Sequence, residues 1–370
     1  MAVRLWLVCG MALAGVALAA MRYAAPAPPP PEVSTSLHVR WEAPEGETRS
    51  LSGSGTLALV ARPGGALAVM PRAEITGAGS WVLDSMVQRM EGSPPAFSLE
   101  GKKPGWRAEA PAQGGSYEVR CATTAVFTLP GTWARRGRPH SVTTLQRLFV
   151  CVPISSRELR RGFLRGYWIG EYPAGVPVPS SFVAVPREAA KAHVSRHLRL
   201  GEFTSPPSEG HPDAWPRYAP FHYALVDKIE ALNDSLRRRS IAARAVHCYS
   251  GFRSPGYNRS VGGAPASQHL TGLAMDFIID DDGDGRMDEL TGDGVVNIDD
   301  ARLVGEIARE LDASGRVVPG GIGIYGLRDP NDPRHPTDAN LHIDIRGRSV
   351  RWARYYPDRA RHDRWQDWPW

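Results

Sequence analysis

The sequence predicts an all-β, sandwich-like domain followed by an α+β domain. Residues 36–154 consist of short apolar runs separated by Gly, Pro and Ser, which is typical of strands and turns. Residues 223–236 place Leu and Ile at helical spacing, which predicts an amphipathic helix. Beyond it, residues 273–279 and 341–345 alternate along two strands. We therefore expect the second domain to span residues 201–370.

The N-terminal stretch predicts export. Arg4 is followed by a mostly apolar run to Met21, and Ala17-Leu18-Ala19 has the small residues of a cleavage signal. We expect residues 1–22 to be a signal peptide or a short membrane anchor, and the proline-rich residues 23–35 to be a semi-rigid linker. The protein should therefore act in the periplasm or cell envelope, membrane-anchored or secreted.

The sequence of the β domain contains no recognisable catalytic motif, so we expect this domain to serve as a spacer or binding module. Residues 155–200 contain several prolines and are interpreted as a connecting segment. The net charge is +5, but only four of the 44 basic residues are lysine and the arginines are scattered. This charge indicates a mild attraction to anionic wall or lipid surfaces and does not favour nucleic acid as a partner.

Two predicted strands of the second domain carry polar side chains on one face. Asp276 lies within the apolar strand 273–279, where a carboxylate is costly to bury unless it is paired or bound to a metal. If this strand pairs with the strand of His342, the two side chains converge, and His269 can reach them from the preceding loop. Two imidazoles and one carboxylate are a common catalytic zinc set. The alternative is that the histidines are ordinary polar residues at strand ends and Asp276 a loop carboxylate.

Residues 280–300 form an acidic insert with nine acidic residues and one basic residue, Arg286. Four aspartates stand at the first, third, fifth and ninth places of a calcium-binding loop: Asp280, Asp282, Asp284 and Asp288. The twelfth place holds Thr291 instead of the usual Glu, so the match is partial, and a second frame runs from Glu289 to Asp300. We expect calcium in this insert; the alternative is a solvated acidic loop.

Four motifs follow one another along residues 201–356: Ser250-Gly251-Phe252-Arg253-Ser254-Pro255-Gly256-Tyr257-Asn258, Val261-Gly262-Gly263, Ser267-x-His269-x-x-Gly272-x-Ala274-x-Asp276 and His342-x-Asp344. In order and spacing they resemble the zinc D-Ala-D-Ala carboxypeptidase and murein endopeptidase family, peptidase family M15, in its His-x-Asp branch. The resemblance implies a Hedgehog-like α+β fold and zinc on His269, Asp276 and His342. It also implies hydrolysis of peptide bonds in the stem peptides of peptidoglycan.

The resemblance further implies roles for residues around the zinc ligands. Arg253 matches a substrate-contacting position, where a guanidinium can hold a carboxylate through two hydrogen bonds; the alternative for Arg253 is a surface salt bridge. Ser267 is expected to support the loop of His269 and to line the substrate site.

At the position of the general base this sequence departs from the family's pattern, because Ala339 stands where other branches carry Glu or Asp. Asp344 is our first choice and Asp338 the second. The alternative role for Asp344 is to orient a ligand imidazole. Two other hypotheses stay open: a zinc-containing, non-hydrolytic wall-binding module, and a functional β domain supported by the C-terminal domain.

Overall fold

The computed structural model describes eight segments of the chain, namely residues 29–76, 82–93, 106–128, 139–205, 214–241, 246–327, 339–356 and 366–367. The predicted signal or anchor segment, residues 1–22, lies outside them. Among the described residues, none of the helices is long and apolar enough to cross a membrane. The chain divides into two compact units: one is Met1–Thr35, Ala73–Arg89 and Ala122–Thr144, and the other is Ser36–Arg72, Met90–Cys121 and Leu145–Trp370.

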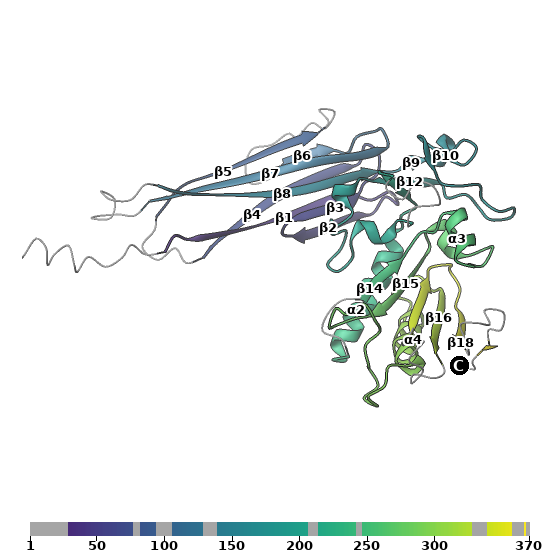
Figure 1. Ribbon diagram of the computed structural model, residues 1–370. Coiled ribbons are helices and arrows are strands. Elements are labelled where there is room, and N and C mark those ends of the chain that lie inside the picture. The colour runs from purple at the N-terminus through teal and green to yellow at the C-terminus, as the bar shows by residue number, and fades with distance from the viewer. Residues whose placement is uncertain are drawn as a thin grey trace, which may run out of the picture. The chain divides into compact units, whose positions relative to one another are not determined.

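The N-terminal strands form two four-stranded sheets, one in the order β2-β1-β4-β6 and the other in the order β3-β8-β7-β5 (Figure 1). Their bounds are β1 (Glu32–Glu42), β2 (Thr48–Gly53), β3 (Thr56–Val60), β4 (Ala66–Thr76), β5 (Val82–Ser93), β6 (Trp106–Glu109), β7 (Gly115–Thr128) and β8 (His140–Val152). Buried and half-buried residues alternate along most of β7, as the period of a strand requires. β1 begins at Glu32, within the last residues of the predicted linker.

Short elements follow between residues 154 and 219. They are β9 (Ile154–Ser155), η2 (Ser156–Glu158), β10 (Phe163–Leu164), β11 (Tyr167–Trp168), β12 (Ser181–Val185), η3 (Arg187–Ala189), η4 (Leu200–Phe203) and β13 (Arg217–Ala219). An apolar cluster from this stretch, including Leu164, Ile169 and Phe182, surrounds Phe252. The segment predicted as a connection thus packs against the residue that precedes Arg253, and it helps to fix that loop.

A six-stranded sheet in the order β14-β15-β17-β16-β18-β19 organises the C-terminal part. Its strands are β14 (Val246–Ser250), β15 (Ala274–Ile279), β16 (Gly321–Leu327), β17 (Asn340–Asp344), β18 (Val350–Tyr356) and β19 (Gln366–Asp367). The helices are α2 (Tyr223–Arg238), α3 (Pro255–Ser260), η5 (Gln268–Thr271) and α4 (Ile298–Ala313). α4 packs on β16 and β17 and contacts α2 (Figure 1). The mixed α and β structure is compatible with a peptidase domain.

The two faces of this sheet differ in chemistry. Met275, Phe277, Leu341 and Ile343 point to the face that shares an apolar core with α2 and α4. Their neighbours point to the opposite, polar face, because side chains alternate along a strand. The antiparallel pairing expected for β15 and β17 is present, and it sets Asp276 opposite His342. The period-two pattern of the sequence is therefore what places these two side chains together.

Helix α2 confirms the helix predicted for residues 223–236. Leu225, Ile229 and Leu232 of its apolar stripe are buried. At its first turn, the Tyr223 hydroxyl accepts a hydrogen bond from the Val60 backbone N–H at 2.8 Å. The Arg49 guanidinium lies 4.3 Å from the centre of the Tyr223 ring. These contacts tie α2 to the end of β3 within one compact unit.

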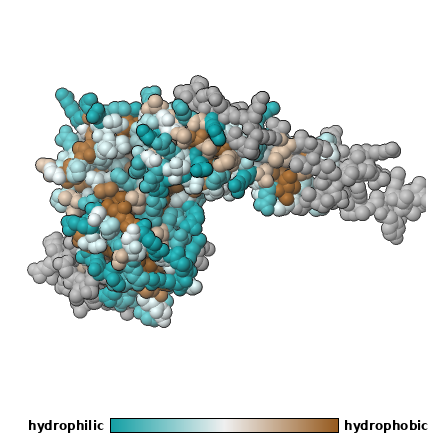
Figure 2. Space-filling view, turned by 180° about the vertical axis from the view of Figure 1, so that it is seen from behind, coloured by the Kyte–Doolittle hydropathy of each residue, from teal (hydrophilic) through white to brown (hydrophobic). Residues whose placement is uncertain are grey.

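The surface carries few large apolar side chains. Figure 2 shows a mostly hydrophilic face on which apolar residues form small, separate patches. Among the described residues, the large hydrophobic side chains that are exposed are Leu145, Phe163, Val178, Tyr249, Val261 and Val318. Apolar residues scattered in this way are normal on protein surfaces.

Candidate metal centre

Three side chains from separate elements converge on the polar face of the sheet. His269 lies in η5, Asp276 in β15 and His342 in β17. Asp276 Oδ1 lies 3.1 Å from His269 Nε2 and 2.9 Å from His342 Nδ1. The two imidazole nitrogens are 3.1 Å apart. All three residues are buried, so the sequence-predicted ligand set forms one compact cluster.

The backbone conformation just before β15 positions His269 in this cluster. Ser267 caps η5, and its hydroxyl accepts a hydrogen bond from the His269 backbone N–H at 3.4 Å. Gly272 ends the turn in the left-handed region, with φ of 69°. A Cβ at this position would lie 2.8 Å from Pro220 Cβ, so glycine is required for both conformation and space. Ser267 thus supports the His269 loop, as its position in the motif predicts.

Hydrogen bonds on the outer side of each imidazole fix its tautomer. His269 Nδ1 lies 2.6 Å from the Gly251 carbonyl oxygen, which can only accept, so Nδ1 carries the proton. His342 Nε2 lies 3.2 Å from Asp344 Oδ2, so Nε2 donates to that carboxylate. The free lone pairs of His269 Nε2 and His342 Nδ1 therefore both face Asp276. This arrangement of outer partners is typical of metal-binding histidines.

The electrostatics of His269 and Asp276 favour the protonation states that bind a metal. Burial lowers the pKa of His269, which keeps this imidazole neutral. Burial alone would raise the pKa of Asp276, but His269 and His342 hold it far below its ordinary range. For His342 burial acts to lower the pKa, yet its hydrogen bonds to Asp276 and Asp344 raise it above the ordinary value. Asp276 is thus a carboxylate that attracts positive charge to this site.

The dimensions and donor atoms of the cluster fit zinc. Tetrahedral zinc bonds of 2.0–2.1 Å separate two ligand atoms by roughly 3.3 Å. The separations in the cluster are 2.9 to 3.1 Å, so small outward movements of the side chains accommodate an ion. Two nitrogens and one carboxylate oxygen are a zinc donor set that leaves a fourth position open.

Comparison with known proteins agrees with this geometry. Residues 214–291 match the family model described as Peptidase M15. This segment of the chain is similar to peptidase family M15. The match includes His269 and Asp276 and indicates peptide-bond hydrolysis by a metallopeptidase. No significant match to the chain was found among curated proteins or solved structures.

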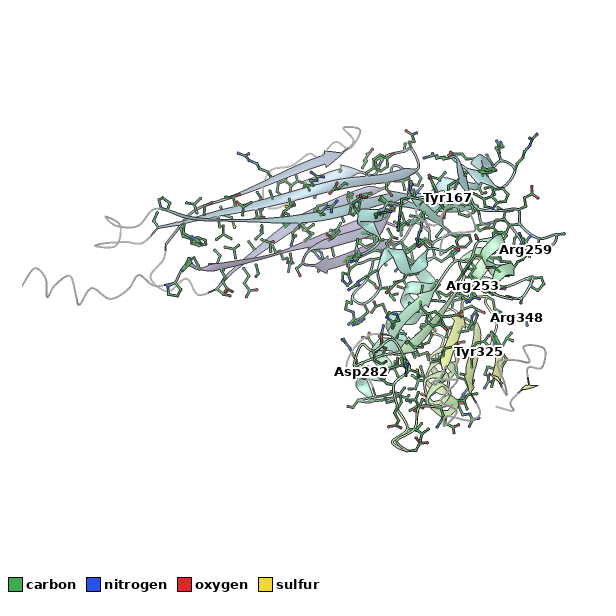
Figure 3. The ribbon with its side chains drawn as sticks, in the orientation of Figure 1. Tyr167, Arg253, Arg259, Asp282, Tyr325 and Arg348 are labelled. Carbon is green, nitrogen blue, oxygen red and sulfur yellow. The ribbon has the colours of Figure 1, made fainter. Side chains whose placement is uncertain are left out.

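Within the matched segment, Arg253 contacts a candidate metal ligand directly. Its Nη2 forms an ion pair with Asp276 Oδ2, the oxygen that does not face the histidines. Its Nε donates to Ser250 Oγ at 2.9 Å, and its backbone N–H donates to the His269 carbonyl at 3.0 Å (Figure 3). Arg253 therefore orients Asp276 in this structure. The substrate contact that the motif implies stays a prediction.

Asp344 occupies a different place from the one expected of a general base. Its side chain is fully buried, Oδ1 accepts from the Gly321 backbone N–H at 2.6 Å, and Arg346 Nε lies within 3.0 Å of both oxygens. The imidazole of His342 stands between Asp344 and the centre of the cluster. This geometry favours the alternative role, orientation of His342, over the role of base that the sequence ranked first. Asp338, the second choice, lies outside the described residues.

The sequence reasoning missed Trp352 of β18. Its indole packs against the His342 ring with 5.2 Å between the ring centres, and its Nε1 donates to the Tyr325 hydroxyl at 2.8 Å. Gly323 lies between them in the sheet register, and a Cβ there would overlap the indole. Gly321 and Gly323, on alternate positions of one strand, were the signal that another group approaches this backbone closely.

The acidic insert follows the end of β15, away from the loop of Arg253 (Figure 3). Carboxylate oxygens of Asp280, Asp282 and Asp284 lie within 4.8 Å of one another. Asp288 is not in this group; its Oδ2 accepts a hydrogen bond from the Asp281 backbone N–H at 2.5 Å. Asp300 lies in the first turn of α4, and it accepts the Leu290 backbone N–H at Oδ1 and the Asn297 backbone N–H at Oδ2. The structure thus brings together three of the four aspartates of the first calcium frame.

Proposed function

We propose that this protein hydrolyses peptide bonds in the stem peptides of peptidoglycan with zinc, as a carboxypeptidase or endopeptidase, outside the cytoplasm. The observation that carries the proposal is the cluster of His269, Asp276 and His342, in which both imidazoles turn an unprotonated nitrogen inward. The family match supports the reaction class. The export-like N-terminus supports the location, and the motifs support the wall substrate and the Hedgehog-like fold. We also propose that an all-β domain precedes the peptidase domain.

Each residue of the site has a separate proposed role in hydrolysis. A zinc ion bound at this site would supply Lewis-acid chemistry to the scissile carbonyl and to the attacking water. His269, Asp276 and His342 would hold the ion. Gly251 and Asp344 keep the two imidazoles in the ligand tautomer. Arg253 neutralises the outer oxygen of Asp276 and, when a substrate binds, is placed to attract the substrate's carboxylate.

The proton acceptor must come from another group, because every oxygen of Asp344 is already bound by a donor. We propose Asp338 for this role, since it lies four residues before His342 and the other branches of the family carry an acid close to this position. A positioned acid–base group contributes roughly a hundredfold or more to turnover.

The direct test uses purified peptidoglycan and the zinc-loaded protein. Fragments released during incubation are identified by mass, and terminal D-Ala release is distinguished from cleavage of cross-links. His269→Ala is the matched inactive control. Cleavage by the wild-type protein that this variant and a chelator both abolish is the expected result. Intact peptidoglycan with a fully zinc-loaded protein would contradict the proposal.

A second candidate function is a zinc-containing module that binds the wall without hydrolysis. The occupied carboxylate of Asp344 favours it, because the first-ranked base is not available for proton transfer. Sedimentation of the zinc-loaded protein with intact sacculi, without released fragments, would support this second function.

We also propose that calcium binds between Asp280, Asp282 and Asp284, whose carboxylates repel one another without a cation. We also propose that the basic protein is mildly attracted to anionic wall or lipid surfaces, and that the N-terminal segment attaches it to a membrane. Nucleic acid is not proposed as a partner.

A further inference from the structure

A charged pair lies buried behind the candidate metal centre. Lys228 belongs to α2 and stands on the apolar stripe of that helix, three residues after Leu225 and four before Leu232. Its Nζ lies 2.7 Å from Asp312 Oδ1 of α4, and the two side chains are 1% and 3% exposed. Burying two charges carries a large desolvation cost, so their place in the core calls for an explanation.

The pair binds the backbone at two neighbouring places, the end of β17 and the residue just before β16. Lys228 Nζ donates to the main-chain carbonyl of Asp344 at 3.0 Å. Asp312 Oδ2 accepts from the Gly320 backbone N–H at 3.0 Å. The next amide along the chain, Gly321 N–H, donates to Asp344 Oδ1 at 2.6 Å. The lysine thus holds the main chain of Asp344, and the aspartate holds the segment that binds the Asp344 side chain.

This network reaches the metal centre in one more step. Asp344 Oδ2 accepts from His342 Nε2 at 3.2 Å, and His342 Nδ1 faces the cluster. A displacement of the Asp344 backbone would move the acceptor that fixes the His342 tautomer. The helices α2 and α4 are therefore connected to a ligand imidazole through buried hydrogen bonds.

We propose that Lys228 and Asp312 are a positioning pair, which fixes the end of β17 so that Asp344 presents His342 to the metal. The inference rests on the proposed zinc site. Stability alone does not explain the pair, because buried ion pairs can often be replaced by apolar residues without loss of stability. An apolar pair would fill the space between the helices, but it could bind neither the Asp344 carbonyl nor the Gly320 N–H.

The test replaces both charges together, in the full chain, with Lys228→Met and Asp312→Leu. The zinc dissociation constant is measured by competition with a chromophoric chelator, and the visible spectrum of the cobalt(II)-loaded protein reports the ligand geometry. Thermal melting gives the stability of the same samples. The matched control is Asn233→Ala, which removes another buried polar contact of α2, a 2.8 Å bond from the Val246 N–H on β14.

We expect the double variant to bind zinc about tenfold more weakly, the lower end of the effect of groups that orient ligands, and to change the cobalt spectrum. The Asn233→Ala control should keep both properties even where its melting temperature falls. A double variant with wild-type zinc affinity and spectrum would overturn the proposal, whatever its stability. If the double variant does not fold, Lys228→Met alone replaces it, because this change also removes the donor to the Asp344 carbonyl, and unchanged zinc affinity in that variant overturns the proposal equally.

The readouts separate this inference from the hydrolase function. Weaker zinc binding in the double variant, with no peptidoglycan cleavage by the wild type, supports the positioning pair and contradicts hydrolysis. Peptidoglycan cleavage by the wild type, with equal zinc affinity in the wild type and the double variant, supports hydrolysis and contradicts the positioning pair.

Discussion

Replacing Asp344 by Asn tests whether its carboxylate orients His342 or takes a proton from water. Oδ1 must remain an oxygen, because the Gly321 N–H donates to it at 2.6 Å. The amide NH₂ of the variant therefore replaces Oδ2 and faces His342 Nε2. Two donors then oppose each other, so the imidazole proton moves to Nδ1. The nitrogen that faces Asp276 and His269 loses its free lone pair, and it can no longer bind a metal.

The magnitude follows from the loss of one oriented ligand. Removing the outer partner of a metal-bound histidine weakens metal affinity by about 10- to 100-fold, or about 1.4 to 2.8 kcal/mol. We expect this loss in a zinc competition titration. The variant also leaves Arg346 without its carboxylate, so the titration must be run at a temperature where circular dichroism shows folded protein.

The companion variant Asp338→Asn gives the contrasting result. It should keep wild-type zinc affinity and lose roughly a hundredfold or more in turnover if Asp338 is the base. Full zinc affinity in Asp344→Asn, together with lost turnover, would refute the orienting role and restore Asp344 as the base. If neither substitution reduced turnover, the hydrolase function itself would be weakened.

Three further predictions concern the metal ligands, acid stability and calcium. Asp276→Ala should lose both zinc and activity, and metal analysis that finds one tightly held zinc in this variant would contradict the ligand set. The pKa values of Asp276 and Asp344 lie below the ordinary 3.8, so both groups stabilise the metal-free fold above about pH 4 and this contribution is lost as the pH falls. The melting temperature should therefore fall as the pH is lowered below 4, and it should fall less steeply in Asp344→Asn than in the wild type. An equally steep fall in both proteins would contradict a contribution of Asp344 to acid stability. Calcium at constant zinc should raise the melting temperature, Asp282→Asn should abolish the rise, and identical curves in calcium and in a selective calcium chelator would argue against the site.

The sequence predicted those parts of the site that depend on strand periodicity. Alternation along residues 273–279 and 341–345 predicted which side chains share a strand face, and the pairing of β15 with β17, which the sequence left as a condition, sets Asp276 opposite His342. Helix α2 followed from its apolar stripe in the same way. The calcium frame also gave the three aspartates that converge, whereas Asp288 is held by a local backbone bond that ligand spacing does not reveal.

What the periodicity did not provide is the direction of each polar atom. Asp344 shares a strand face with His342, and from the sequence this suggested proximity to the metal. In the structure the imidazole itself separates the two, because Nδ1 and Nε2 point in opposite directions. A shared strand face shows that Asp344 and His342 are neighbours, but it does not show which of them lies nearer to the metal. Their order along the hydrogen bonds decides whether Asp344 can act as the base or orients the imidazole.

Lys228 shows the same limit and also how it could be reduced. A lysine between Leu225 and Leu232 on an apolar stripe breaks the helix pattern, and the sequence analysis did not use this break as a signal of a buried charge that needs a partner. Its partner, Asp312, is 84 residues away and follows only from the packing of α4 beside α2. Asp276 in a strand and Lys228 in a helix both interrupt an apolar pattern, and both are buried charges of the network that the proposed positioning pair forms with Asp344 and His342. Under that proposal, these two breaks in the pattern mark residues that hold the metal site.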